Sequence, residues 1–319
     1  AAGLSWKLRS NARGLWLLLP AGQATITLNR LSLMNSDTAS CFEYDRTLER
    51  IYAVRPYSQA ELFTRPVSEL NWPDPDVCQP DWSQEIIRLA PSGIDVSYRK
   101  AAVTYSIKGL RFASLPAGKS GTNPEPGYLQ SIDGAWTPTD GLRDLVSEIL
   151  ARRVFDSPDK SHPFYRLQPE AWLESELRRS LASFGLGIDP RFIYTQIPAW
   201  IGGDRSVIDI LAITSEGRLV IIEVKAGEDM NLPMQGLDYW LAIEQSRLRG
   251  DLERHGLFKG YRIKDEPPIL YLAAPVLRFH RSFAGICRMI APGIELYQMG
   301  LNSNWRKEVK LRRLYRLNA

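Results

Sequence analysis

Apolar residues make up 44% and charged residues 24% of the 319-residue chain, which are the proportions of an ordinary soluble protein. The 40 lysines and arginines exceed the 36 aspartates and glutamates by only four, which does not by itself imply nucleic-acid binding. Three widely separated cysteines exclude a disulfide framework or a zinc-binding spacing and fit a reducing cytoplasm. No apolar run reaches the ~20 residues that a membrane-spanning helix needs.

Residues 1–115 are expected to form a small β-rich domain, because short apolar runs alternate with turn residues. The run at residues 15–22 follows basic residues and mimics a signal peptide, but the strand-like run directly after it favours a first strand. No chemistry stands out in this domain, so we expect it to serve docking or assembly, with a protein partner or in a homo-oligomer. The candidate strands are 15–19, 25–28, 85–89, 94–98, 103–107 and 110–113.

A stretch dense in proline and glycine at residues 116–141 predicts a linker. Strand-like and helix-like runs mix from residue 142 to the end, and this mixture predicts an α/β domain. The expected helices are 141–153, 170–184 and 233–250, with a short one at 282–290. The expected strands are 192–197, 269–273, 294–299 and 309–317, in addition to a hairpin.

The hairpin carries the most informative charges of the chain. Two apolar, β-branched runs at residues 207–213 and 218–225 are joined by a turn that contains a glycine. Asp209 interrupts the first run, and Glu223 and Lys225 interrupt the second. Side chains alternate along a strand, so Glu223 and Lys225 point to the same side. Because buried charges are costly unless they are paired or hold a metal, this cluster predicts a Mg²⁺ site.

The hairpin and the helix before it resemble the PD-(D/E)xK nuclease superfamily. Asp209 stands at the metal-binding aspartate, and Glu223-Val224-Lys225 stands at the (D/E)xK motif, although Ile208 replaces the proline of the signature. The preceding helix is similar to that of archaeal Holliday-junction resolvases, with a glycine eleven positions after Glu174. This spacing favours Glu174 over Glu170 as the carboxylate of the helix.

A second pair of residues is similar to the RecB-like and lambda-exonuclease-like branch. Gln235 and Tyr239 stand at its Q-xxx-Y extension, about ten residues after Lys225. The whole resemblance covers residues 165–245. It implies that Gln235 and Tyr239 contact DNA near the cut and help to place Lys225.

The resemblance implies a restriction-endonuclease-like core, in which helices flank a mixed central sheet, within residues 142–319. It also implies a Mg²⁺-dependent deoxyribonuclease, for which Mn²⁺ can substitute, that leaves 5′-phosphate and 3′-hydroxyl ends. Asp209, Glu223 and the Val224 carbonyl would hold one or two ions, and Glu174 would contribute directly or through water. Lys225 would stabilise the charge that develops in the reaction. DNA repair, restriction and anti-phage defence are the pathways left open.

The basic C-terminal tail offers a second kind of DNA contact. Arg312, Arg313 and Arg316 lie in a predicted strand and could bind phosphates, or could protect a sheet edge from aggregation. The other site residues also have ordinary alternatives. Glu174 could pair with Arg178 on a helix surface, and Gln235 and Tyr239 could simply pack.

Two other functions remain open on the sequence alone. A nuclease-like domain could bind nucleic acid or a protein partner without cutting. Alternatively, the N-terminal β-rich domain could be the working part of an adaptor protein.

Overall fold

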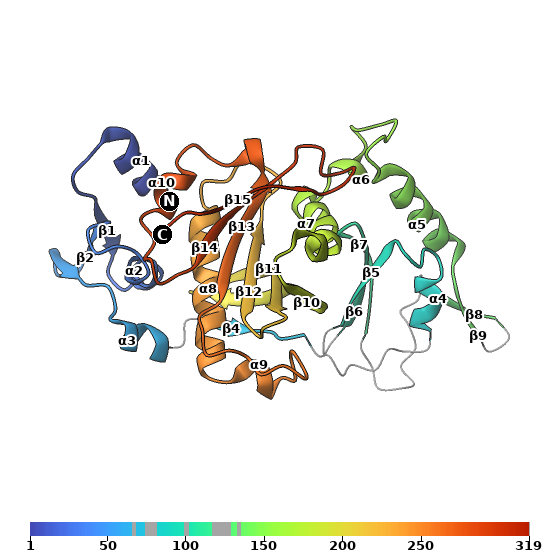
Figure 1. Cartoon of the computed structure of the whole chain (residues 1–319), viewed down its shortest axis with the longest axis horizontal. Coiled ribbons are helices and arrows are strands. Elements are labelled where there is room, and N and C mark those ends of the chain that lie inside the picture. Colours follow the sequence, from blue (N-terminus) through green and yellow to red (C-terminus); the bar gives the residue numbers. More distant parts are fainter. Residues whose placement is uncertain (66–67, 74–81, 99–101, 117–128, 133–134, 319) are drawn as a thin grey trace.

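The computed structural model describes residues 1–65, 68–73, 82–98, 102–116, 129–132 and 135–318. The architecture is mixed α/β, as predicted, and is built around a seven-stranded sheet in the order β15-β14-β13-β12-β11-β10-β4 (Figure 1). Strands β12, β13 and β14 are parallel to one another, and the other neighbours are antiparallel. The strands are β4 (Ser68–Leu70), β10 (Ile188–Ile201), β11 (Asp204–Thr214), β12 (Leu219–Val224), β13 (Ile269–Pro275), β14 (Leu296–Leu301) and β15 (Leu311–Arg316).

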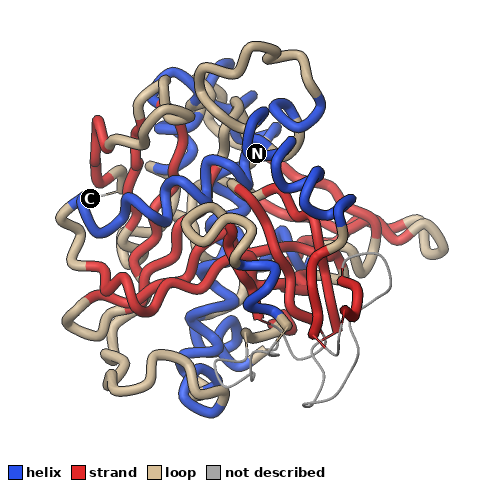
Figure 2. Tube along the Cα trace, turned by 90° about the vertical axis from the view of Figure 1, so that its right-hand side faces the viewer, coloured by secondary structure: helices blue, strands red, loops and turns tan. Residues whose placement is uncertain are grey.

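Helices cover both faces of this central sheet (Figures 1 and 2). On one face, Leu237 of α8 (Leu232–Leu248) packs in a core with Ile221. On the other face, Leu173 of α7 (Pro169–Ser180) packs in a core with Ile222. The first core also takes in α1 (Ala2–Ser10), α2 (Thr25–Ser32), α3 (Gln59–Thr64), α9 (Asp251–Arg254) and α10 (Phe283–Cys287).

The helix expected over residues 170–184 is confirmed, with one refinement at its end. Pro169 is its first residue, where its missing N–H costs nothing. A 3-10 turn, η1 (Leu181–Phe184), follows α7 and ends at Gly185, which has the left-handed φ of 69°. Helix α8 and the late strands β13, β14 and β15 also lie where they were expected, within a few residues.

Two of the N-terminal strand predictions are wrong. Residues 25–28 open helix α2, and residues 85–89 fall mostly within α4 (Ser83–Ile87). Both runs are rich in β-branched residues, but tertiary packing overrides that weak preference. Leu28 and Leu31 lie one helical turn apart and are both buried, and Trp82 and Ile86 are placed in the same way.

The other N-terminal strand predictions are confirmed. β1 (Trp16–Pro20) forms a small sheet with β2 (Ser40–Asp45) and β3 (Arg50–Val54), which packs against the first core. A separate sheet consists of β5 (Ile94–Tyr98), β6 (Ala102–Ile107) and β7 (Leu110–Pro116). The remaining elements are β8 (Leu129–Ile132), β9 (Ala135–Pro138), α5 (Asp140–Arg152), α6 (Pro163–Arg166) and η2 (Val276–Arg278).

The β5–β7 sheet has its own apolar core. Val103, Tyr105 and Ile107 of β6 are fully buried against α4 and α5, together with Val146 and Ile149 of α5. This core therefore joins residues on both sides of the expected linker at 116–141, most of which lies outside the described residues. The division into domains at residues 115 and 142 stays a prediction. No helix in the described ranges has the length and apolar character needed to cross a membrane.

Candidate active site

The predicted hairpin is formed by β11 and β12, and Asp209 stands where the two strands part. Their antiparallel pairing runs from Ile213 and Leu219 to Ile210 and Ile222. The next residue, Asp209, turns its carboxylate into the gap between the strands. Its Oδ2 accepts a hydrogen bond of 2.8 Å from the backbone N–H of Val224. The local sequence thus fixes Asp209 directly beside the Glu223-Val224-Lys225 segment.

Glu223 and Lys225 form the same-side pair that strand alternation predicts. Lys225 Nζ donates to Glu223 Oε1 at 2.8 Å, and the Glu223 side chain is only 1% exposed. Burial alone would lower the pKa of Lys225, but the Glu223 and Asp209 carboxylates outweigh it and raise that pKa. Lys225 is therefore held in its charged form. The second oxygen, Glu223 Oε2, is buried and has no hydrogen-bond partner among the described residues.

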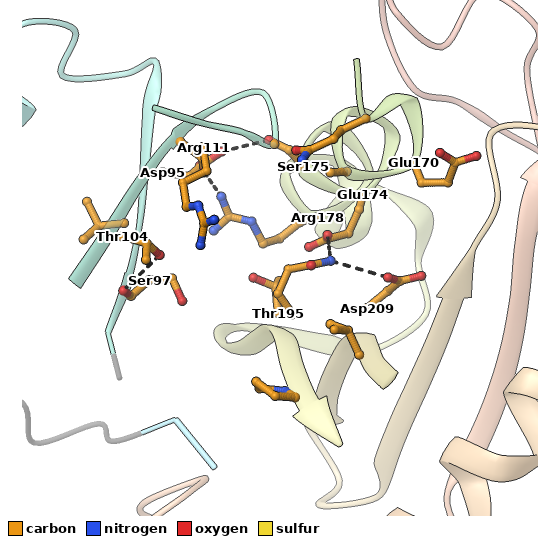
Figure 3. A pocket seen from close by; sticks show the side chains of 18 of the residues that line it. Asp95, Ser97, Thr104, Arg111, Glu170, Glu174, Ser175, Arg178, Thr195 and Asp209 are labelled. Carbon is orange, nitrogen blue, oxygen red and sulfur yellow. Dashed lines mark hydrogen bonds and ion pairs between the residues drawn. The ribbon is translucent and has the colours of Figure 1, made fainter. Parts of the chain in front are cut away.

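Glu174 reaches the same site from the opposite direction, on α7. Its carboxylate accepts a hydrogen bond from the side-chain amide of Gln196, and the same amide lies 3.4 Å from Asp209 Oδ1. In Figure 3, dashed lines to the labelled Glu174 and Asp209 mark these two contacts. Gln196 therefore links Glu174 to Asp209.

The backbone of β10 changes course at Gln196. Gln196 has a φ of 54°, a left-handed conformation that a non-glycine residue adopts only at a cost of about 1–3 kcal/mol. As a result, the neighbours Thr195 and Gln196 both line the cavity beside α7, whereas Ile197 points into the core under α8. The irregular backbone thus turns an amide toward Glu174 and Asp209 that a regular strand would turn away.

Burial and the charge of Asp209 disfavour the charged forms of Glu174 and Glu223. Burial raises the pKa of Glu174 well above its usual value, and the charge of Asp209 adds to this effect. Burial and the charge of Asp209 also raise the pKa of Glu223 well above its usual value. The pKa of Asp209 is raised by burial as well, against the effect of the Val224 N–H. Such a cluster is stabilised either by a proton or by a cation.

A cavity of about 500 Å³ opens beside Glu174 and Asp209. One side consists of α7, β10 and β11, and the other of the β5–β7 sheet (Figure 3). The cavity also exposes Glu170, whose charge adds slightly to the raised pKa of Asp209. Glu170 lies on the cavity wall one helical turn before Glu174. Glu174 is linked to Asp209 through the Gln196 amide, so Glu174 remains the helix carboxylate expected at the site.

The residues fit a divalent cation in part. Asp209 and Glu223 offer neighbouring carboxylates, and Glu223 Oε2 is a buried oxygen without a donor, as a cation ligand would be. However, no three histidine, cysteine, aspartate or glutamate side chains of the described part group closely enough to hold a metal ion. Glu174 is bound to the Gln196 amide instead. Asp209 and Glu223 are therefore the pair that could hold a cation directly.

Gln235 and Tyr239 lie on the α8 side of the sheet. Gly236 lets the helix approach closely, since a Cβ there would lie 2.5 Å from a methyl group of Leu272. Tyr239 is only 5% exposed, with its hydroxyl beside Ser206 and the Val207 backbone. Burial raises the pKa of Tyr239, and the charges of Glu223 and Asp209 raise it further. Gln235 is half-buried, and its Oε1 has no hydrogen-bond partner in the described structure.

The basic residues of the tail lie away from this cluster. Arg312, Arg313 and Arg316 are exposed on β15, which is the edge strand at the opposite end of the sheet from β4 and β10. Arg312 lines a different, smaller cavity of about 310 Å³ with Asn302 and Asn304. Their role in binding DNA stays a prediction.

Sequence reasoning missed Gln196 and Asp95. Asp95 on β5 accepts hydrogen bonds from Ser175 at 2.8 Å and from Arg179 at 2.9 Å, and it also pairs with Arg178. The alternative partner expected for Glu174, Arg178, is thus engaged by Asp95. No sequence signal marks either residue, because both act through contacts between distant segments.

Comparison with known proteins adds no family to this picture. No protein-family model matches the chain. A search of curated proteins also found no relative.

Proposed function

We propose that the chain is a metal-dependent nuclease that hydrolyses phosphodiester bonds in DNA, built on a restriction-endonuclease-like core. The observation that carries the proposal is the junction of Asp209, Glu223 and Lys225 at the point where β11 and β12 part. Burial raises the pKa of both carboxylates, Asp209 raises the pKa of Glu223 further, and a charged lysine lies 2.8 Å from Glu223, so the arrangement is costly. Such clusters occur more often at functional sites than at purely structural ones.

The roles proposed for the residues follow from their surroundings. Asp209 and Glu223, with the Val224 carbonyl, would hold Mg²⁺ or Mn²⁺. A divalent cation supplies polarisation of the phosphoryl group and acidification of a water molecule. Lys225, which Glu223 keeps charged, would stabilise the negative charge that builds up on the phosphate in the transition state.

Glu174 has an indirect role in this proposal. Gln196 donates to Glu174 and lies 3.4 Å from Asp209, so it orients both carboxylates. Glu174 would orient a water molecule or accept its proton, and burial together with the charge of Asp209 raises its pKa, which favours proton uptake. Products with 5′-phosphate and 3′-hydroxyl ends are proposed with this mechanism. The proposed setting is the cytoplasm, in repair, restriction or anti-phage defence.

A second candidate function is a nuclease-like domain that binds nucleic acid or a protein without cutting. It is favoured by the absence, within the described part of the chain, of three potential ligands close enough to hold a metal. Under this alternative, Lys225 would only neutralise Glu223.

One experiment separates the two functions. Purified protein is incubated with linear, circular and single-stranded DNA, in Mg²⁺, in Mn²⁺ or in EDTA. The nuclease proposal expects cutting with either metal and none in EDTA, and it expects Glu223→Gln to be inactive. Binding without any cutting, unchanged by metal, would support the second candidate instead.

A further inference from the structure

The β5–β7 sheet presents one polar face to the cavity. Cross-strand pairing joins Asp95 to Ser106, Ser97 to Thr104, and Ser106 to Arg111. Directly paired residues share a face of a sheet. These five residues also line the cavity, whereas the opposite face of the sheet is packed on α4 and α5. We call Asp95, Ser97, Thr104, Ser106 and Arg111 the polar wall.

The polar wall is fixed firmly to α7. Asp95 holds Ser175, Arg178 and Arg179 of that helix. At the β6–β7 turn, Gly109 lies so close to α7 that a Cβ would fall 2.1 Å from the Ala171 carbonyl oxygen.

The buried side chain of Arg153 is a second connection between the β5–β7 sheet and α7. It donates to the Lys108 carbonyl at 2.8 Å and stacks 4.6 Å from the Trp172 ring. The wall and the helix that carries Glu174 therefore form one unit.

The charge of the polar wall favours an anion. Asp95 is neutralised by two arginines, so Arg111 carries the remaining charge of the wall. Arg205 on β11 faces the same cavity, two residues before Val207 and four before Asp209. Both arginines are exposed, and neither forms an ion pair with a residue that the structure describes. Ser97, Thr104 and Ser106 add hydroxyl-bearing side chains to the lining of the same cavity.

An aromatic ring stands beside Arg205. Trp200 on β10 pairs across the strands with Arg205, so it lies on the same side of the sheet as Arg205, outside the lining of the cavity, and it is 49% exposed. An exposed ring next to basic side chains is the arrangement with which proteins bind single-stranded nucleic acid. The cavity of about 500 Å³ has the size of a small-ligand site, which suits part of one strand and is too small for a duplex.

We propose that the polar wall and the ends of β10 and β11 form a groove for a single nucleic-acid strand. Arg111 and Arg205 bind its phosphates, and a base stacks on Trp200. This inference rests on the proposed function, because it names the substrate form that the site would receive at Asp209, which lines the cavity. It also gives the β5–β7 sheet a role in substrate binding.

The test measures binding in the absence of cutting. The full chain carrying Asp209→Asn is titrated with an oligothymidylate of about 12 nucleotides in Mg²⁺ at several salt concentrations, and the salt dependence gives the number of phosphate contacts. Adding Arg111→Gln and Arg205→Gln should lower the slope of log K against log salt by about 1.4, about 0.7 for each contact. Trp200→Ala should weaken binding roughly fivefold or more without changing the slope.

Matched controls keep the outcome interpretable. Arg46→Gln with Arg50→Gln removes the same charge from the exposed β2–β3 hairpin and should change nothing. Arg111→Lys with Arg205→Lys should retain the slope, which separates charge from misfolding. An equal effect of the control pair, or tighter binding of a duplex of the same length, would overturn the inference.

The proposed function is measured separately, by cutting with the unmodified chain. Cutting with an unchanged salt slope in the arginine variants would refute the groove and leave the nuclease intact. Binding through these residues without any cutting would refute the nuclease and leave the groove.

Discussion

Asp209 is the residue on which the geometry of the site depends, because it touches both halves of it. One oxygen accepts the Val224 N–H at 2.8 Å, and the other lies 3.4 Å from the Gln196 amide that binds Glu174. Replacing Asp209 with asparagine removes the charge of the side chain and keeps its shape. Its substitution is therefore the cleanest test of the proposed chemistry.

Asp209→Asn should abolish cutting while the fold persists. Loss of groups that merely support a metal ligand typically costs 10–100-fold, so loss of a ligand charge should cost at least about 100-fold. The melting temperature should be unchanged or a few degrees higher, because the carboxylate no longer raises the pKa of Glu174 and Glu223. Rates of cutting and thermal melts check both statements. Full activity in this variant would rule out the mechanism.

Glu223 gives the protein a pH-dependent stability of predictable sign. Its pKa in the folded chain is raised well above the usual 4.5, so the folded state binds more protons than the unfolded state above that pH. Stability should therefore fall as pH rises from about 4.5 through the raised pKa of the folded state. In Glu223→Gln, the free energy of unfolding measured with urea should depend less on pH between pH 5 and 8.

Two controls accompany the pH measurement. Glu253→Gln changes an exposed glutamate and should leave the dependence as it is in the unmodified chain. Added Mg²⁺ should raise the melting temperature of the unmodified chain at pH 8 more than at pH 5, because a cation replaces the proton. A stability that rises with pH in the unmodified chain, and equally in Glu223→Gln, would show that the carboxylate is not held in this way.

At the scale of elements, helix α7 depends on the polar wall for its position. Asp95, whose side chain is 19% exposed, holds three side chains of the helix around Glu174. Asp95→Asn removes the charge from these contacts and should lower the free energy of unfolding by about 1–3 kcal/mol. Cutting should fall with kcat affected more than KM, since the substitution shifts Glu174 without removing a phosphate contact.

Urea unfolding and steady-state rates measure these two effects. Asp37→Asn, on an exposed loop, is the matched control and should leave both quantities unchanged. Unaltered kcat together with a lower stability would limit Asp95 to a structural role.

The sequence predicts those elements whose signals are local. The α7 helix with its proline and glycine ends, the β11–β12 hairpin and the Glu223 and Lys225 pair all follow from residues near one another in the chain. The helices at 25–32 and 83–87 do not, because burial of Leu28 and Ile86 depends on distant partners. Gln196 escapes sequence reasoning for the same reason. Its φ of 54° and its place between Glu174 and Asp209 exist only once β10, β11 and α7 have assembled.

Across the whole molecule, the basic edge strand and the cavity lie at different places on the sheet. β15 is separated from β11 by β14, β13 and β12. Neutralising Arg312, Arg313 and Arg316 should therefore weaken binding of long duplex DNA, with a slope of log K against log salt smaller by about 0.9 per contact. Binding of a short oligonucleotide that only fills the cavity should not change.

Parallel salt titrations with the two kinds of DNA measure this difference. If neither slope changes, β15 is a charged edge strand that resists aggregation, and the DNA path does not cross it.

The last prediction concerns the form of DNA that the molecule accepts. A groove between the polar wall and β10 has room for one strand, so a covalently closed duplex must open before it can bind. Separating one base-pair step costs about 1.4 kcal/mol, which is about tenfold in rate for each step opened. Linear or single-stranded DNA should therefore be degraded at least about ten times faster than closed circles, and nicked circles should lie between them.

Variants of α8 test whether the preference also depends on the Q-xxx-Y pair. Tyr239 is 5% exposed, and so buried a ring offers no face to a base, which leaves its hydroxyl beside Ser206 and Val207 as the functional group. Tyr239→Phe should therefore slow cutting of every DNA form, as should Gln235→Ala, whereas Trp200→Ala should reduce the preference for single strands. Gel assays of the three forms with each variant measure these effects. Equal rates on closed and linear DNA, with Gln235→Ala and Tyr239→Phe fully active, would assign both residues to packing and make the enzyme an endonuclease that cuts intact duplex.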